Sequence, residues 1–192
     1  MTRKASKLER PVQAANSPSE RQTLTLQQAL NLGLRHHTTG DLVKAESIYQ
    51  QILQTNPNQP EALHLLGVIS HQNEEYDTAV NRINKVLSLK PDFPEAHSNL
   101  GVSLEKLGKL DEAVAHYQRA VAINPDYAEA HSNLGVALQK SGQLEEAVTS
   151  CYKALTINPE FAGAHYNLGN ALKELERLNE AVTGYKKAID IK

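Results

Sequence analysis

The sequence predicts an all-α fold, a solenoid of five stacked helix-turn-helix units. The first observation is a row of five glycines, each preceded by a leucine, at a strict spacing of 34 residues: Gly33, Gly67, Gly101, Gly135 and Gly169. The second is that an alanine follows each glycine after twelve residues, and a proline follows each of the first four after 24 residues. Such a period is typical of repeat proteins, whose small units bury their apolar faces only by stacking.

Each unit is predicted to contain two helices, because apolar residues recur with the period of an α-helix in two successive segments. First helices are expected near residues 25–38, 59–73, 93–107, 127–141 and 161–175. Second helices are expected near residues 41–55, 75–89, 109–123, 143–157 and 177–191.

Glycines and acidic residues mark the ends of these helices. Gly40, Gly108 and Gly142 follow first helices, where a left-handed residue ends a helix. Asn58, Asp92 and Asp126 are predicted N-caps, because a glutamate follows each of them three residues later at the spacing of a capping box. The prolines just before these caps stop the preceding helices.

The best copy of the unit reads AHSNLGVSLEKLGKLDEAVAHYQRAVAINP, from Ala96 to Pro125. It resembles the tetratricopeptide repeat, and the match extends over about Thr25–Lys192 without an insertion or deletion. The strings AHSNLG and AHYNLG also resemble the repeats of O-linked N-acetylglucosamine transferases and their bacterial relatives. The resemblance implies a right-handed superhelical solenoid whose concave face holds a polypeptide.

Two regions are predicted along the chain. Residues 1–22 carry five Lys or Arg against two Glu, include two prolines and lack apolar periodicity, so we expect a flexible basic tail rather than a nucleic-acid or membrane arm. Residues 23–192 are predicted to form one domain. Its five repeats lie at approximately 25–58, 59–92, 93–126, 127–160 and 161–192.

Composition narrows the class of partner. A net charge of −2 and a pI near 6.4 give no electrostatic reason to expect nucleic acid. No apolar run approaches the ~20 residues of a membrane span, and no signal peptide is evident, so we expect no membrane partner and a cytoplasmic protein. The single Cys151 fits a reducing compartment. It stands where other units have Tyr49, Tyr117 and Tyr185, which we expect between neighbouring units, and is predicted to be a buried packing thiol.

The sequence predicts no enzyme, no cofactor and no metal site. It contains no phosphate-binding glycine loop, no HExxH and no nucleophile elbow, and the repeats leave no room for a catalytic domain. His97, His131 and His165 recur four residues before the repeat glycine. They belong to units about 10 Å apart, whereas zinc needs its nitrogen ligands at ~2 Å from one centre, so we interpret them as packing residues.

The candidate binding residues lie on the first helices. Asparagine recurs two residues before the repeat glycine, at Asn31, Asn99, Asn133 and Asn167, and Leu65 breaks the column. In the family that the chain resembles, this position faces the concave side. An amide offers both a donor and an acceptor to a peptide unit, although these asparagines could instead only cap or solvate the helix face. The remaining predicted peptide-binding residues flank the column: Asn170, Val102, Val136, Tyr166, Lys106 and Lys140. Tyr166 stands where the family's carboxylate-binding members need a lysine, which argues against that specialisation.

These features predict a protein-interaction scaffold that binds an extended peptide or a partner protein in its concave groove. One alternative is the substrate-recruiting N-terminal part of a larger enzyme similar to O-linked N-acetylglucosamine transferases. Another is a self-assembling structural element. The last predicted helix has no successor in the sequence, so we expect apolar groups of Leu178, Ala181, Tyr185 and Ile189 to be uncovered. We expect self-association through this end, with fraying of the final helix as the alternative.

Overall fold

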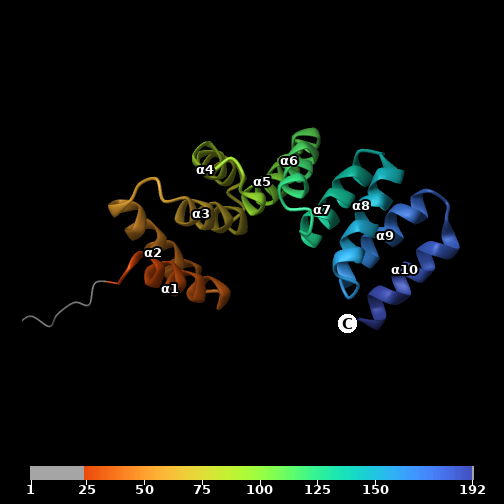
Figure 1. Ribbon diagram of the computed structural model, residues 1–192, viewed down its shortest axis with the longest axis horizontal. Helices are drawn as coiled ribbons and strands as arrows, with labels where there is room; N and C mark the ends of the chain where they lie inside the picture. Colours follow the sequence, from red (N-terminus) through yellow and green to blue (C-terminus); the bar gives the residue numbers. More distant parts are fainter. Residues whose placement is uncertain (1–23, 192) are drawn as a thin grey trace, which may run out of the picture.

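The structure, a computed structural model, describes residues 24–191, and this part of the chain folds into helices without a strand. Ten helices follow one another in five pairs (Figure 1): α1 (Leu26–Thr38), α2 (Leu42–Thr55), α3 (Pro60–Gln72), α4 (Tyr76–Leu89), α5 (Pro94–Lys106), α6 (Leu110–Ile123), α7 (Ala128–Lys140), α8 (Leu144–Ile157), α9 (Ala162–Glu174) and α10 (Leu178–Asp190). The predicted tail at residues 1–22 lies outside the described residues. Within residues 24–191, no helix combines the length and the apolarity needed to span a bilayer.

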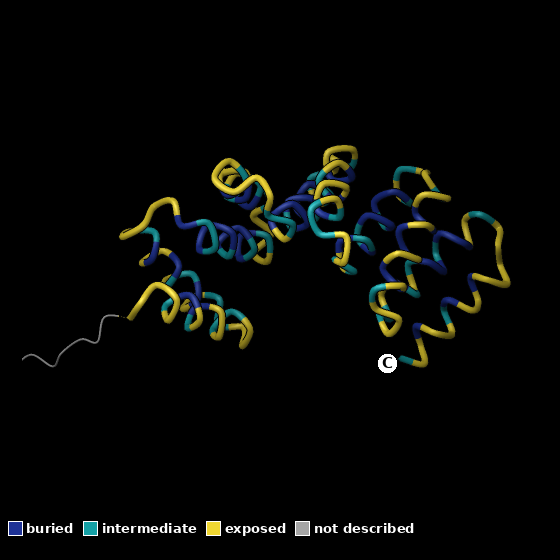
Figure 2. Tube along the Cα trace, viewed as in Figure 1, coloured by how far each residue is buried: buried dark blue, intermediate teal, exposed yellow. Residues whose placement is uncertain are grey.

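The predicted solenoid is confirmed, and every helix begins and ends within one residue of its predicted bounds. Each helix packs against the next one along the chain. In addition, first helices of consecutive repeats contact each other, α3 with α5, α5 with α7 and α7 with α9. The first helices therefore line the inner side of an arch, and the second helices lie outside (Figure 1). Figure 2 shows buried residues running through the middle of the pairs.

The predicted N-caps at Asn58, Asp92 and Asp126 are wrong by one residue. The caps are Gln59, Phe93, Tyr127 and Phe161. Pro94 explains the shift in α5, since its fixed φ suits the first helical position and the residue before it becomes the cap. The carboxylate of Asp92 instead accepts a hydrogen bond from Arg119 at 2.7 Å. The capping box that we expected in the later repeats occurs in α1, between Thr25 and Gln28.

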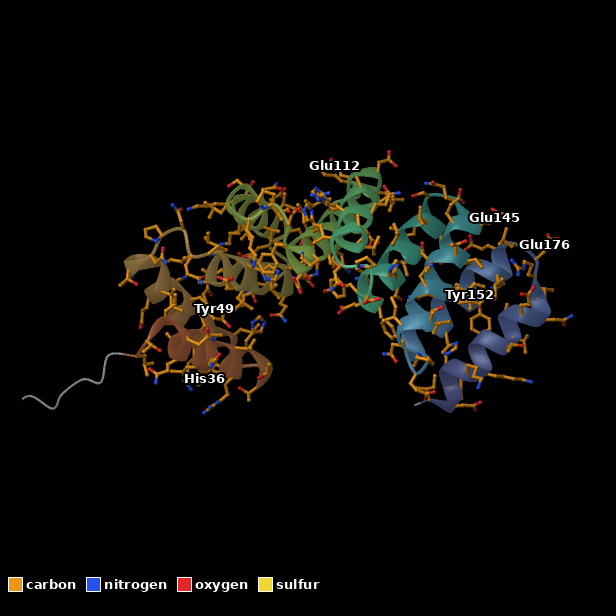
Figure 3. All side chains as sticks on the ribbon, viewed as in Figure 1. His36, Tyr49, Glu112, Glu145, Tyr152 and Glu176 are labelled. Atoms are coloured by element: carbon orange, nitrogen blue, oxygen red, sulfur yellow. The ribbon has the colours of Figure 1, made fainter. Side chains whose placement is uncertain are left out.

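The two helices of each pair meet at the repeat glycine. A Cβ at Gly101 would lie 2.7 Å from Cε1 of Tyr117, and one at Gly169 would lie 2.6 Å from Cε1 of Tyr185. The tyrosines therefore pack on the glycine of their own repeat, a contact that the prediction missed. Tyr117 also lines a pocket with Asn133 and Val136 of the next repeat, as predicted for a residue between neighbouring units. Figure 3 shows Tyr49 in the equivalent place between α1 and α2.

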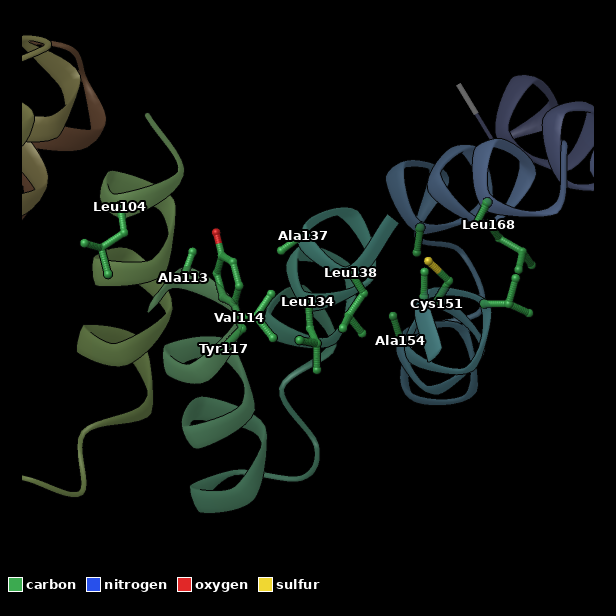
Figure 4. Close-up of a cluster of buried hydrophobic side chains, with 14 of the residues drawn as sticks. Leu104, Ala113, Val114, Tyr117, Leu134, Ala137, Leu138, Cys151, Ala154 and Leu168 are labelled. Carbon is green, nitrogen blue, oxygen red and sulfur yellow. The ribbon is translucent and has the colours of Figure 1, made fainter. Parts of the chain in front are cut away.

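Cys151 fills this place in the fourth repeat, with its Sγ atom 2.6 Å from where a Cβ at Gly135 would lie. The side chain is fully buried among the apolar residues of α7, α8 and α9 (Figure 4). Burial raises the pKa of the thiol to about 12, so it stays protonated at neutral pH. The prediction of a buried packing thiol is confirmed.

Of the four residues on α10 that the sequence predicted to be uncovered, Leu178 and Ile189 are exposed and Tyr185 is half-buried. Ala181 is buried against α9, so the prediction is wrong for this residue.

Three turns inside the helix pairs use the predicted glycines. Gly40, Gly108 and Gly142 have φ angles of 81°, 74° and 75°, in the left-handed region. In the second and fifth repeats the equivalent residues are glutamates, Glu74 with φ of 63° and Glu176 with φ of 59°. An L-residue in this region costs about 1–2 kcal/mol because its Cβ approaches a carbonyl oxygen. These two turns therefore hold local backbone strain.

The recurring histidines hold the chain that enters α5, α7 and α9. Nε2 of His97, His131 and His165 contacts the carbonyl oxygen of the proline six residues earlier, at 2.9, 3.0 and 2.9 Å. His97 also contacts His116, with 3.0 Å between their Nδ1 atoms. Because Nε2–H of His97 donates to the carbonyl, its Nδ1 accepts the proton of His116, and this arrangement requires a neutral His97 ring.

Replacing Gly135 by Ala should lower the free energy of unfolding by about 1–3 kcal/mol, because overpacking a close helix contact forces the backbone or Cys151 to shift. The matched control is Gly163→Ala in α9, where the new Cβ would meet only the ring of Phe161, at 3.1 Å. Urea denaturation of both variants checks this. Equal stability of Gly135→Ala and the parent would show that the helix contact is looser than described.

Replacing Glu74 by Gly should raise the free energy of unfolding by up to about 1 kcal/mol. Relief of the left-handed strain exceeds the extra entropy that a glycine loses on folding. The reverse change, Gly108→Glu, should destabilise the third repeat by a similar amount. The melting temperatures of the two variants should move in opposite directions; a shift of both in the same direction would contradict the assignment of strain.

Acid should destabilise the protein through His97 and His116. Burial lowers the pKa of both imidazoles, with the neighbouring Arg119 adding to the effect at His97 and the His97 ring adding to it at His116. Asp92 and Glu112 oppose these shifts. The unfolded chain therefore binds more protons as pH falls below about 6.5, so stability present above that pH is lost below it.

The test compares the free energy of unfolding at pH 7.5 and pH 5. His116→Ser, which introduces the residue of the equivalent position Ser150, should show a smaller loss between the two pH values than the parent. His165→Leu is the control and should retain the parent's acid sensitivity. An unchanged loss in His116→Ser would exclude this pair as its source.

Candidate peptide-binding groove

The ten residues predicted to bind a peptide lie on four first helices, α1, α5, α7 and α9. Asn99, Asn133 and Asn167 are half-buried at equivalent positions, whereas Asn31 on α1 is exposed. The structure brings only some of the ten together.

Five of the predicted residues line one pocket between α5 and α7, with a volume of about 170 Å³. They are Val102, Lys106, Asn133, Val136 and Lys140. Val102 and Val136 are half-buried and give the pocket an apolar part. Two further lining residues, Glu105 and Tyr117, were not predicted from the sequence.

Glu105 organises the polar side of this pocket. Its carboxylate accepts a hydrogen bond from Nζ of Lys140 at 2.7 Å and another from the hydroxyl of Tyr117 at 2.7 Å. Burial raises the pKa of Tyr117, and the neighbouring carboxylate raises it further, so the hydroxyl remains a donor. Lys106 is exposed and forms no ion pair with any residue in 24–191, so it contributes a positive charge beside the pocket.

Two of the four asparagines in the column, Asn99 and Asn167, are already hydrogen-bonded to the preceding repeat. Nδ2 of Asn99 lies 2.9 Å from Nε2 of His64, and Nδ2 of Asn167 donates to Oγ of Ser132 at 3.0 Å. These two amides keep Oδ1 for a ligand. Asn133 lines the pocket, and its side chain has no hydrogen-bond partner among the described residues, so both its donor and its acceptor are unpaired.

Side chains that pair between neighbouring repeats are 35 residues apart in the sequence. Asn99 and His64 are 35 residues apart, as are Asn167 and Ser132. A second row has the same spacing: His37 with Gln72, Glu105 with Lys140, and Gln139 with Glu174. Successive first helices thus lie side by side with a register offset of one residue. Complementary residue types 35 apart were the sequence signal that could have identified His64 and Glu105.

His64 illustrates how this pairing fixes a protonation state. Its ring is buried and lies 4.8 Å from the ring of Phe93, measured between centroids. Burial lowers the pKa of His64, although the carboxylates of Glu95 and Glu61 oppose the shift. A neutral ring can accept the amide proton of Asn99 through Nε2, which a protonated ring cannot do.

The other predicted residues lie elsewhere. Asn31 lines a separate hollow of about 370 Å³ between α1 and α3, beside Leu34 and Leu65. Oδ1 of Asn170 accepts a hydrogen bond from the hydroxyl of Tyr185 at 2.9 Å. Tyr166 lies at the C-terminal end of the arch, where its side chain lines a groove between α9 and α10. The predicted residues therefore form one central pocket and separate flanking positions rather than one continuous site.

Comparison with solved structures gives several solenoids of similar size. A crystal structure of MamA is 29% identical with a TM-score of 0.72, covering 83% of this chain and 94% of that one. MamA from Desulfovibrio magneticus RS-1, from residue 41 to the end, is 25% identical with a TM-score of 0.74, covering 86% and 93%. YrrB, described as a TPR protein with an unusual peptide-binding site, is 27% identical with a TM-score of 0.68, covering 86% and 85%. No curated protein matches significantly.

Family models match along most of the repeats. A model described as TPR repeat matches residues 104–142, and models described as tetratricopeptide repeat match residues 37–101, 128–161 and 150–183. These models do not test the finer resemblance to O-linked N-acetylglucosamine transferases, which stays a prediction. The repeat spacing, the stacked helix pairs and these matches together show that the chain belongs to the tetratricopeptide repeat family.

Proposed function

We propose that the chain is a non-enzymatic interaction module that binds an extended peptide along its first helices, with the pocket between α5 and α7 as the anchoring point. The observation that carries this proposal is the unpaired amide of Asn133 beside Val102 and Val136. When a ligand forms a hydrogen bond with a half-buried amide that has no partner, the complex gains net free energy of binding. Its equivalents Asn99 and Asn167 have already used their donors.

The chemistry of the pocket defines the ligand. The amide of Asn133 matches the N–H and C=O of one peptide unit, which an extended chain presents and a helix does not. The two valines accept a small apolar side chain. Lys106 favours an acidic side chain next to it, because Lys140 is already paired with Glu105 at 2.7 Å. The proposed ligand is therefore an extended segment with an apolar residue followed or preceded by an acidic one.

The comparison with YrrB supports a peptide ligand, since that protein of the same fold is described as having a peptide-binding site. The alternative of a substrate-recruiting part of a larger transferase-like enzyme uses the same groove for the same purpose. This alternative therefore predicts the same effect of changing Asn133. It differs only in that the bound segment would afterwards be modified by the enzyme.

Replacing Asn133 by Ala should weaken binding of peptides selected from a random extended-peptide library by about 0.5–1.5 kcal/mol, roughly two- to tenfold, through loss of a hydrogen bond. The melting temperature should not change, because no partner is lost within residues 24–191. Isothermal titration calorimetry and thermal unfolding measure the two quantities.

Asn31→Ala is the matched control, since Asn31 lies on α1, outside the central pocket. It should leave the affinity of the same peptides unchanged. Unaltered affinity in Asn133→Ala, or an equal loss in Asn31→Ala, would reject the central pocket as the anchoring point.

A further inference from the structure

One row of side chains crosses the concave face and pairs each first helix with the next. Its members are 35 residues apart, and three of its pairs are hydrogen-bonded: His37 with Gln72, Glu105 with Lys140, and Gln139 with Glu174. Between α3 and α5, which contact each other near the middle of the arch (Figure 1), the same row has His71 and Lys106. Both can carry a positive charge, and no hydrogen bond joins them within residues 24–191. The row therefore lacks an acidic group between α3 and α5.

A hydrogen bond to α5 fixes the tautomer of His71. Its Nδ1 atom lies 3.1 Å from Oγ of Ser103, and that hydroxyl donates its proton to the carbonyl oxygen of Asn99 at 3.0 Å. Nδ1–H of His71 must therefore be the donor, which leaves the lone pair of the neutral ring on Nε2. A second proton on this ring would be bound by Nε2 and would leave the hydrogen bond to Ser103 intact.

The surroundings of His71 keep its ring neutral in the free chain. The side chain is half-buried, and its ring lies 5.3 Å from the ring of Tyr76 on α4, measured between centroids. Burial lowers the pKa of His71, and the positive charge of Lys106 on α5 lowers it further. On α1, His37 contacts Gln72, the residue next to His71. An anion beside both His71 and Lys106 would reverse the effect of the lysine, and the ring would then take up a proton.

Lys106 connects this position to the central pocket. The side chain is exposed and forms no ion pair with any residue in 24–191. It lines the pocket between α5 and α7 together with Val102 and Val136. A peptide that contacts these valines can therefore place its neighbouring side chain at Lys106, on the side of α5 that faces α3.

We propose that Lys106 and His71 together bind the carboxylate of an acidic side chain of the extended peptide. A carboxylate has two oxygens, one for the ammonium group of Lys106 and one for Nε2 of His71. This inference rests on the function proposed above and adds two points to it. The acidic residue of the ligand lies on the α3 side of the residue that contacts the valines, and its binding is accompanied by proton uptake.

The proton uptake makes the affinity depend on pH. The pKa of His71 is lowered in the free chain and is higher with a carboxylate beside it, so the complex binds more protons than the free chain between these two values. Affinity therefore rises as pH falls through the pKa of the complex, and it levels off below the pKa of the free chain. Aspartate and glutamate remain ionised in this range, because their ordinary pKa values are about 4.

The first experiment needs no peptide and uses sulfate, which stays a dianion between pH 5.5 and 8. NMR follows the imidazole signals of the full chain over this range, in sodium sulfate and in sodium chloride of equal ionic strength. The pKa of His71 should be higher in sulfate than in chloride, and Lys106→Gln should abolish the difference. His131, whose ring contacts the carbonyl oxygen of Pro125, is the internal reference and should titrate alike in both salts.

The second experiment uses a peptide from the extended-peptide library that carries a glutamate beside an apolar residue, and its analogue with glutamine in place of the glutamate. Lowering the pH from 7.5 to 6 should raise the affinity of the acidic peptide by about threefold and leave that of its analogue unchanged. His71→Asn should remove this pH effect, because its amide can still donate to Ser103 but cannot be protonated. Lys173→Gln, which removes an exposed lysine on α9, is the matched control and should retain the effect.

Three results would overturn the inference: the same pKa of His71 in both salts, the same pH dependence for both peptides, or an unchanged pH effect in a folded His71→Asn variant. Failure of the proposed function looks different, because it appears as unaltered affinity in Asn133→Ala. A peptide that loses affinity in Asn133→Ala but binds equally well at pH 7.5 and pH 6 would support the central pocket and reject the site at His71.

Discussion

The close approach of two helices at the repeat glycine is the constraint on which the rest of the structure depends. The partner of that glycine changes from Tyr49 to Ile83 to Tyr117 to Cys151, yet each is fully buried. Even the smallest of them, Cys151, leaves no room for a Cβ on the facing helix. The residue that packs on the glycine can therefore vary in size, whereas the glycine itself cannot be replaced by a larger residue. Every helix hairpin keeps the same geometry as a result.

Because the helix hairpins share one geometry, each first helix is offset from the preceding one by the same single residue. Side chains 35 residues apart therefore pair across the concave face. The pairing uses side chains that would otherwise be available to a ligand, such as Asn99, Asn167 and Lys140. At Asn133 the pattern is interrupted: the residue 35 positions earlier is Ser98, which lies beside Tyr127 and partly offsets the rise that burial causes in the pKa of that tyrosine. The peptide-binding site that we propose therefore lies where an internal pair is missing.

Stacking also explains why the two ends of the arch differ. Each interior repeat covers an apolar stripe on the second helix before it and offers small residues for that purpose, as Ala130 and Ala137 do in α7. In α1 the residues at these positions are Gln28 and Arg35, and both are exposed. α10 keeps the apolar stripe, with Ile189 and Val182 exposed.

The sequence by itself determined the all-α solenoid, the bounds of its helices to within one residue, the left-handed turns at Gly40, Gly108 and Gly142 and the burial of Cys151. These follow from periodicity and from local backbone preferences, which a single unit carries. Tertiary structure alone decided that Tyr117 packs on the glycine of its own repeat and also lines a pocket with the next, and that Asn133 stays unpaired while Asn99 does not. Such features depend on the distances between helices and on which side chain the neighbouring repeat presents, and the 34-residue period does not specify these.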